Sequence, residues 1–187
     1  SRPTAASRKM PVSSNVRPHM RITAPIRAAC FDWGGTLMSE VGPQDRSMAL
    51  WPKVEVINAA LEAVSELSRV MPLFIATNAS ISYRPDIVAA LARGGLSTYF
   101  TDVFCFMEIG FKKNQPQFWQ VVESVTNLPL QQIAKVGDSL EYDAIAPRSF
   151  GVQSVWLDPM GQSQSSHQGV PVVSNLVEFA TMVRNAA

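Results

Sequence analysis

The stretch that decides the fold is Cys30-Phe31-Asp32-Trp33-Gly34-Gly35-Thr36-Leu37, which follows directly on Ala28 and Ala29. A short, uninterrupted apolar run is typical of a strand buried on both faces. The Gly-Gly pair after it lets the backbone leave the strand sharply and approach a ligand closely. Asp32 therefore ends a predicted strand, where its carboxylate could attack a ligand, although aspartate before glycine is also common in plain turns.

From about Ile26 onward, short apolar runs alternate with longer segments of helical spacing, which is typical of parallel strands joined by crossover helices. We expect strands at residues 28–31, 73–76, 103–106, 133–136 and 152–157. Ligands of open α/β sheets bind beyond the carboxyl ends of the strands, so the polar residues that follow these runs should meet there. The pattern predicts an α/β, three-layer Rossmann-like fold with a mainly parallel sheet of about five strands and helices on both faces.

Helical spacing predicts the connecting segments. Pro52 is expected to begin a helix whose apolar face is Val54, Ile57, Leu61, Val64 and Leu67. Further helices are expected over 85–93, 116–126 and 175–185, the last one capped by Asn175. Residues 161–169, rich in Gln and Ser, are expected to form a loop.

The composition fits one well-packed domain, since the chain has 187 residues and is 47% hydrophobic. Both cysteines, Cys30 and Cys105, lie in apolar runs without a CxxC partner. We interpret them as reduced core residues of an intracellular protein. No apolar run approaches the length of about 18 residues that a membrane-spanning helix needs.

The N-terminal segment differs from the rest in charge. Residues 1–31 hold six basic residues and no acidic one, which leaves 10 of the 16 basic residues to balance all 15 acidic ones. We predict a basic, disordered tail or cloning remnant over 1–25 and a core domain over 26–187. A cytoplasmic protein is expected, or an organellar one if the tail is a transit peptide, and nucleic-acid binding by the tail is the weakest interpretation.

Three further groups of polar residues accompany Asp32. They are Thr77-Asn78 after the run 73–76, Lys113 before Pro116-Gln117-Phe118, and Gly137-Asp138-Ser139 followed by Asp143. Asp138 and Asp143 offer the hard oxygen ligands that magnesium prefers, although Gly-Asp-Ser also suits a helix start. A lysine before a helix is most often solvated, and Thr-Asn after a strand is a weak signal alone.

In this order, the four groups resemble the motifs of the haloacid dehalogenase (HAD)-like hydrolase superfamily. The resemblance implies that Asp32 is a nucleophile that accepts a phosphoryl group as an aspartyl-phosphate. It also implies one Mg²⁺ ion, ligated by Asp32, Asp138 and the backbone carbonyl of Gly34, with Asp143 in support.

The resemblance assigns the remaining motif residues to the phosphoryl group. Thr77 would donate its hydroxyl, and the backbone at Gly35 and Asn78 would complete the binding site. Lys113 would neutralise charge in the transition state. Lys112 is the competing assignment, because Asn114 departs from the Lys-Pro pair that is usual in the family.

Spacing leaves little room for a lid domain. About a dozen residues, 38–51, separate the glycine turn from Pro52, and the stretch from Thr77 to Lys113 has room for one helix and one strand. The chain therefore resembles the capless subset of the superfamily. Its active site is expected to be open, or covered by another subunit of a homo-oligomer.

One motif residue is missing. Most phosphatases of the superfamily carry a second aspartate two residues after the first, where this chain has Gly34. General acid–base catalysis of this kind contributes roughly 10²- to 10⁴-fold. The favoured interpretation is a hydrolase of a small phosphorylated substrate with a good leaving group, or one that borrows an acid from Glu40, Asp45 or Glu141.

Two alternatives stay open. The first is a catalytically weak phosphate- and metal-binding module that acts through partners. The second is a carbon–phosphorus hydrolase, because phosphonoacetaldehyde hydrolases resemble the segment Asp32-Trp33-Gly34-Gly35-Thr36. That family uses a lysine from a lid to form a Schiff base, and only Lys53 lies near the corresponding place.

Overall fold

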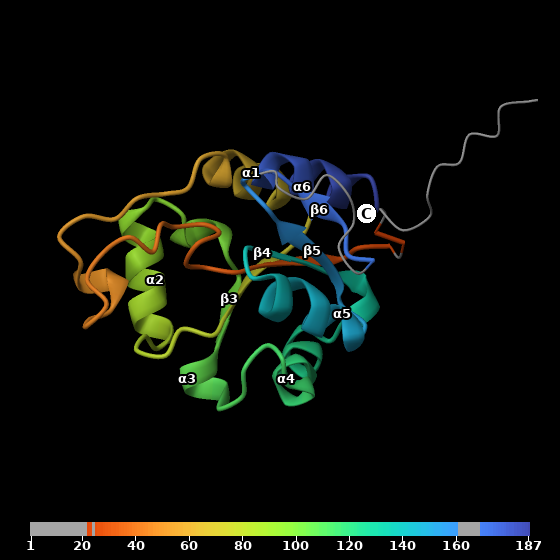
Figure 1. Cartoon of the computed structure of the whole chain (residues 1–187). Coiled ribbons are helices and arrows are strands. Elements are labelled where there is room, and N and C mark those ends of the chain that lie inside the picture. Colours follow the sequence, from red (N-terminus) through yellow and green to blue (C-terminus); the bar gives the residue numbers. More distant parts are fainter. Residues whose placement is uncertain (1–21, 24, 161–168) are drawn as a thin grey trace, which may run out of the picture.

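A computed structural model describes residues 22–23, 25–160 and 169–187. Its centre is a sheet of six strands in the order β3-β2-β1-β4-β5-β6, and all neighbouring strands are parallel (Figure 1). The strands are β1 (Ala28–Phe31), β2 (Leu73–Thr77), β3 (Asp102–Cys105), β4 (Ile133–Gly137), β5 (Gln153–Leu157) and β6 (Val172–Val173). The five predicted strands are all present, and the two-residue strand β6 is additional because it is too short to give a periodic pattern.

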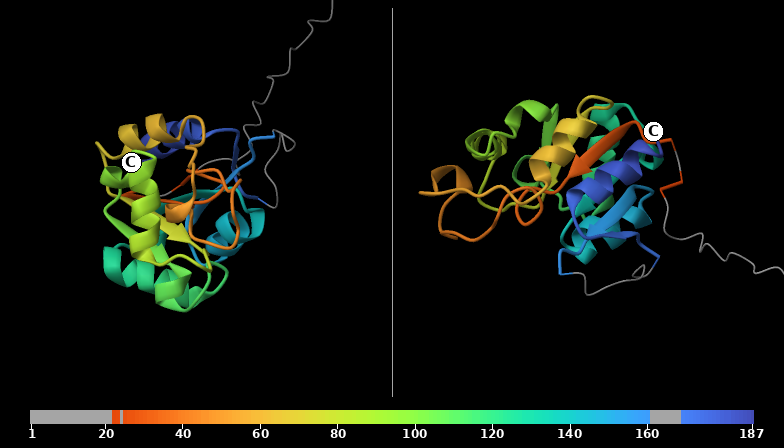
Figure 2. Two further views of the ribbon diagram at one scale, coloured as in Figure 1. Left: turned by 90° about the vertical axis from the view of Figure 1, so that its left-hand side faces the viewer. Right: turned by 90° about the horizontal axis from the view of Figure 1, so that it is seen from above.

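Helices cover both faces of the sheet, as predicted for a three-layer α/β fold (Figures 1 and 2). α1 (Ala60–Leu67) and α6 (Leu176–Arg184) pack side by side on one face, and α4 (Pro116–Thr126) lies on the other. The other helices are α2 (Arg84–Arg93), α3 (Phe106–Ile109) and α5 (Ala146–Ser149), with 3-10 turns at Met48–Leu50, Ser97–Tyr99 and Leu130–Gln132 and a π-helix at Leu140–Ile145. None of the helices in the described ranges is long and apolar enough to cross a bilayer.

Strand β1 is buried on both faces because its residues alternate between two apolar clusters. Ala29 and Phe31 belong to the cluster under α1 and α6, whereas Ala28 and Cys30 belong to the cluster under α4. The Phe31 ring meets the ring of Phe179 edge to face, with centroids 5.4 Å apart. Phe31 is the one large apolar side chain of β1, and its burial contributes about 1.5 to 3 kcal/mol.

The predicted helix starting at Pro52 is wrong in its first two turns, because the helix begins only at Ala60. Val56 instead forms an antiparallel bridge with Met38, which holds this part of the chain extended. Ala59 then adopts a left-handed conformation, with φ of 68°, immediately before the helix. Pairing with a distant segment has overridden the local helical spacing.

The other predicted helices agree closely with the structure. α4 has the predicted bounds, and α2 begins one residue earlier than expected, at Arg84. The side chain of Asn175 caps α6, because its Oδ1 accepts a hydrogen bond from the backbone N–H of Glu178 at 3.0 Å. The predicted loop at 161–169 lies almost entirely outside the described residues, as does nearly all of the predicted N-terminal tail.

Between β1 and α1 the chain forms an irregular segment, residues 39–59, which we call the arm (Figure 2). Its only helical part is the short turn Met48–Leu50. Between β2 and Lys113 the chain is filled by α2, β3, α3 and a 3-10 turn of the core. The described part of the chain therefore carries no substantial cap domain, as the spacing predicts.

Arg93, the last residue of α2, holds the arm against the core. Its Nη1 donates hydrogen bonds to the carbonyl oxygens of Met48, Ala49 and Trp51, at 3.3, 3.1 and 2.6 Å. One guanidinium thus satisfies several carbonyl groups of a segment that has little secondary structure of its own.

We expect Arg93→Ala to lower the free energy of unfolding by roughly 1 to 3 kcal/mol, since hydrogen bonds from a charged donor contribute about this much. Urea denaturation followed by circular dichroism measures the change. Arg69→Ala is the matched control, because Arg69 is exposed and its guanidinium makes no hydrogen bond or ion pair with the described residues. Equal losses in the two variants would contradict the anchoring role of Arg93.

Candidate active site

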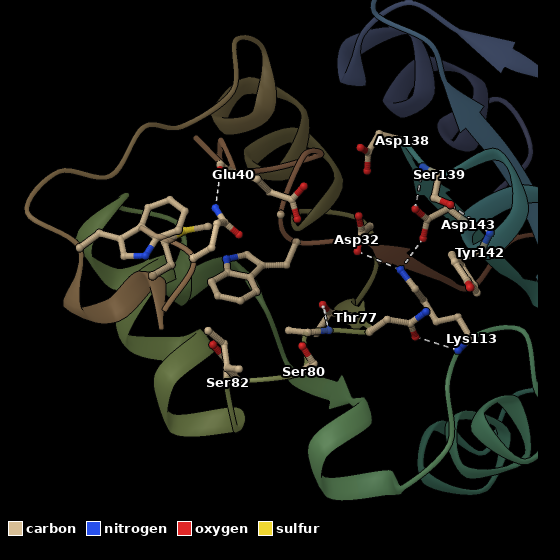
Figure 3. Close-up of a pocket in the computed structure, with 18 of the residues that line it drawn as sticks. Asp32, Glu40, Thr77, Ser80, Ser82, Lys113, Asp138, Ser139, Tyr142 and Asp143 are labelled. Atoms are coloured by element: carbon tan, nitrogen blue, oxygen red, sulfur yellow. Dashed lines mark hydrogen bonds and ion pairs between the residues drawn. The ribbon is translucent and has the colours of Figure 1, made fainter. Parts of the chain in front are cut away.

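The polar motif residues meet at the carboxyl ends of three neighbouring strands. Asp32 follows β1 directly, Thr77 ends β2 and Asp138 follows β4. Because β1 pairs with both β2 and β4, these side chains lie on one edge of the sheet. Together with Lys113 they line a cavity of about 420 Å³ (Figure 3).

Three carboxylates form a cluster in this cavity. Asp32, Asp138 and Asp143 each place an oxygen within 4.8 Å of the others. The hydroxyl of Thr36 joins two of them, since its Oγ1 lies 3.2 Å from Asp32 Oδ2 and 3.1 Å from Asp138 Oδ1. Clustered carboxylate oxygens of this kind suit a hard divalent cation.

Lys113 provides the positive charge beside the cluster. Its Nζ lies 2.9 Å from Asp32 Oδ1 and 2.6 Å from Asp143 Oδ1, and the residue is only 2% exposed. Asn78 fixes the Lys113 backbone, because Asn78 Oδ1 accepts a hydrogen bond from the Lys113 N–H at 2.8 Å. The Asn78 side chain therefore helps to position Lys113.

The neighbouring lysine lies elsewhere. Lys112 is exposed, and its Nζ stands 5.2 Å from the centre of the Phe106 ring. It does not line the cavity, whereas Lys113 does. The geometry thus favours Lys113 over the competing assignment.

A second buried lysine, Lys135 on β4, was not singled out in the sequence. It is 0% exposed, and its Nζ lies 2.7 Å from Asp143 Oδ1. Asp143 Oδ2 also accepts a hydrogen bond from the backbone N–H of Ser139 at 3.1 Å. Lysine is almost never fully buried unless it is paired, so a lysine inside an apolar strand was the available signal.

The electrostatics of the cluster follow from burial and from these contacts. Burial, and then the charge of Asp143, raises the pKa of Asp32 to about 7 against the opposing effect of Lys113. Burial also opposes the ionisation of Asp143, but Lys113 and Lys135 outweigh it and hold its pKa below the ordinary value. The carboxylate of Asp143 is therefore a fixed negative charge that keeps Lys113 in place.

Position 35 requires glycine because the Asp138 carboxylate lies very close to its backbone. Its φ is 79°, and a β-carbon at this position would lie 2.5 Å from Asp138 Oδ2. Any other residue would have to displace the Asp138 carboxylate. Thr77, also in the cavity, is 3% exposed, and its Oγ1 accepts a hydrogen bond from the Ala79 N–H at 3.1 Å.

Glu40 enters the same cavity from the arm (Figure 3). A β-carbon on Gly34 would lie 2.8 Å from Cγ and 3.0 Å from Cδ of Glu40, which is too close for two carbon atoms. Burial, and then the charge of Asp32, raises the pKa of Glu40. The other two acids considered from the sequence do not line the cavity, since Asp45 is exposed beside Arg46 and Glu141 is exposed on the π-helix.

The aspartate cluster and the buried lysine lie beyond the carboxyl ends of parallel strands, where open α/β sheets bind their ligands. The family model of haloacid dehalogenase-like hydrolases matches residues 44–151. The chain therefore belongs to the haloacid dehalogenase-like hydrolases, which confirms the resemblance seen in the motifs. Asp32 itself precedes the matched range.

Relatives and solved structures agree with this assignment. YfnB of Bacillus subtilis, named as a HAD-hydrolase, is 26% identical over 106 residues, which cover 56% of this chain and 44% of YfnB. The chain thus spans less than half the length of that curated relative. The crystal structure of YfnB bound to magnesium superposes with a TM-score of 0.60 and 23% identity, over 69% of this chain and 56% of that one.

Two further solved structures match most of the chain. An uncharacterized protein from Listeria monocytogenes serotype 4b has a TM-score of 0.74 and 17% identity, with 86% of this chain and 98% of that chain covered. The 2-haloacid dehalogenase of Pseudomonas syringae pv. Tomato DC3000 has a TM-score of 0.69 and 14% identity, with 87% and 100% covered. At these identities the likeness shows the fold, which is the predicted Rossmann-like α/β fold.

Proposed function

We propose that the chain is a magnesium-dependent phosphohydrolase that acts on a small phosphorylated substrate through an aspartyl-phosphate. The observation that carries the proposal is the position of Asp32 at the end of β1, in contact with Lys113 and beside two further carboxylates. Membership of the hydrolase family supports it. A cavity of about 420 Å³ suits a small molecule.

The carboxylate of Asp32 would attack phosphorus and displace the leaving group. Lys113 would neutralise the charge that develops on the phosphoryl oxygens, and the Thr77 hydroxyl would donate a hydrogen bond to one of them. The backbone at Gly35 and Asn78 would complete the phosphate site. Asp32, Thr77, Asn78 and Lys113 line one cavity, which supports this arrangement.

The donor set fits Mg²⁺. Asp138 is exposed to the cavity and Asp32 faces it, so both carboxylates, with the carbonyl of Gly34, would hold the ion. Asp143 is fully buried and forms ion pairs with two lysines, so it would support the metal ligands from behind without being the main ligand itself. Bound Mg²⁺ would polarise the phosphoryl oxygens and stabilise negative charge in the transition state.

The leaving group determines how much acid catalysis the site must supply. Gly34 can donate no proton, so the fastest substrates should have leaving groups that depart as stable anions, such as acyl or aryl phosphates. The same glycine favours the second candidate, a module that binds metal and phosphate without turning over. The carbon–phosphorus hydrolase is less supported, because Lys53 pairs with Glu55, is 78% exposed and does not line the cavity.

Removing a metal ligand tests the proposal. Asp138→Asn is expected to weaken Mg²⁺ binding by at least about 100-fold, since even the loss of an outer partner costs roughly 10- to 100-fold. Isothermal titration calorimetry measures the affinity. In parallel, EDTA should abolish hydrolysis of 4-nitrophenyl phosphate by the parent, and excess Mg²⁺ should restore it.

Glu141→Gln is the matched control, because it removes an exposed carboxylate near the site that does not line the cavity. Its Mg²⁺ affinity should equal that of the parent. Unchanged affinity in Asp138→Asn, or hydrolysis that persists in EDTA, would refute the metal site. Mg²⁺ binding without turnover of any phosphoester, anhydride or acyl phosphate would favour the binding module.

A further inference from the structure

Among the residues that the structure describes, Glu40 is the one carboxylate that lines the cavity but stands outside the cluster of Asp32, Asp138 and Asp143. The cavity contains Asp32, Asp138, Asp143 and Glu40 as its acidic residues. The first three are tied to Thr36, Lys113 or Lys135 by hydrogen bonds. The Glu40 carboxylate makes no hydrogen bond or ion pair with any described residue, so it remains available to a ligand.

The Glu40 side chain occupies the space that a side chain on residue 34 would need. A β-carbon on Gly34 would lie 2.8 Å from Glu40 Cγ. Figure 3 shows the Glu40 carboxylate turned toward Asp32 and Asp138. An acid that is absent from position 34 is thus replaced in space by one that enters from the arm.

The backbone beside Glu40 is well fixed. Met38 pairs with Gly34 on one side and with Val56 on the other. The side-chain amide of Gln44 also donates a hydrogen bond to the Glu40 carbonyl oxygen at 3.0 Å. These contacts hold Glu40 over the glycine turn without using its carboxylate.

We propose that Glu40 is the proton donor to the leaving group, and the base that later activates water, in the reaction proposed above for this site. In the first step Asp32 attacks phosphorus, the bond from phosphorus to the leaving oxygen breaks, and the Glu40 carboxyl gives that oxygen its proton. An alcohol, the aspartyl-phosphate and the Glu40 carboxylate result.

In the second step the Glu40 carboxylate takes a proton from water, and the hydroxide attacks phosphorus. The bond between phosphorus and Asp32 breaks, which releases hydrogen phosphate and restores both carboxyl groups. The net reaction is hydrolysis of a phosphate monoester. This role widens the substrate class to alkyl phosphates, such as sugar phosphates, whose leaving alkoxide needs a proton.

A pair of substrates tests this role. We would measure kcat/KM with Mg²⁺ for 4-nitrophenyl phosphate, which needs little protonation, and for a sugar phosphate. Glu40→Gln should lower the sugar-phosphate value about 10²- to 10⁴-fold, the usual contribution of general acid–base catalysis, and the aryl value far less. Asp45→Asn is the matched control on the arm, since Asp45 is 71% exposed, and it should leave the ratio of the two values unchanged.

A second pair of variants moves the acid back to position 34. Glu40→Ala empties the space, and adding Gly34→Asp to it should recover sugar-phosphate hydrolysis at least tenfold. A loss of equal size on both substrates in Glu40→Gln, or no loss on either, would overturn the role of Glu40 while leaving the proposed function intact. A parent that binds Mg²⁺ and hydrolyses neither substrate would refute the proposed function and this role with it.

Discussion

Asp32→Asn is expected to reduce turnover of 4-nitrophenyl phosphate by on the order of 10⁴- to 10⁶-fold, the scale seen when an enzyme loses its nucleophile. The amide nearly preserves the shape of the side chain but cannot attack phosphorus. Folding should survive, because Lys113 keeps its contact with Asp143 when the Asp32 charge is removed. Steady-state kinetics and thermal unfolding by circular dichroism measure the two effects.

Trapping of the intermediate provides an independent readout. The parent, quenched in acid during turnover of a labelled aryl phosphate, should carry label on the protein, whereas Asp32→Asn should carry none. Hydrolysis by Asp32→Asn at the parent rate would show that Asp32 is not the nucleophile. Label recovered on the Asp32→Asn protein would lead to the same conclusion.

Lys113→Met is expected to lower kcat by roughly 10²- to 10³-fold, the cost of removing one donor that stabilises transition-state charge. The Nζ of Lys113 lies within 2.9 Å of Asp32, so the lost charge acts at the reacting carboxylate itself. Mg²⁺ should still bind, because the three carboxylates remain. Kinetics and calorimetry on the same preparation separate the two properties.

Lys112→Met is the natural comparison, because it removes the neighbouring positive charge outside the cavity. Its kcat should stay within about threefold of the parent value, because solvent screens an exposed charge that lies outside the cavity. If Lys112→Met loses activity and Lys113→Met does not, the assignment of the two lysines must be exchanged.

The strands and the meeting of their polar ends could be predicted because the signals are local. Each buried strand is a short apolar run, and parallel topology alone brings Asp32, Thr77 and Asp138 to one edge. The start of α4 is equally local, since Pro116 suits only the first turn of a helix.

What could not be predicted depends on contacts between distant segments. Val56 is extended because Met38 pairs with it, and nothing in the helical spacing after Pro52 reveals that partner. The same holds for Glu40, one of three candidate acids with Asp45 and Glu141, because only the folded path of the arm brings its side chain into the cavity. The role of Lys135 also depends on the fold, because its strand is otherwise apolar and only the folded chain brings Asp143 beside its charge.

In the proposed reaction, the strand ends would act on the phosphoryl group and the arm would act on the leaving group. Residues that would handle phosphorus come from strand ends that the core fixes, whereas Glu40 comes from the arm, which is held by the Met38–Val56 bridge, by Arg93 and by the buried side chains of Met48 and Trp51. With the role proposed for Glu40, changes in the arm would alter which alcohols are released while the phosphoryl chemistry persists. Within one lineage, substrate range could then diverge through substitutions at the exposed positions of the arm, whereas its buried residues Met48 and Trp51 belong to the core.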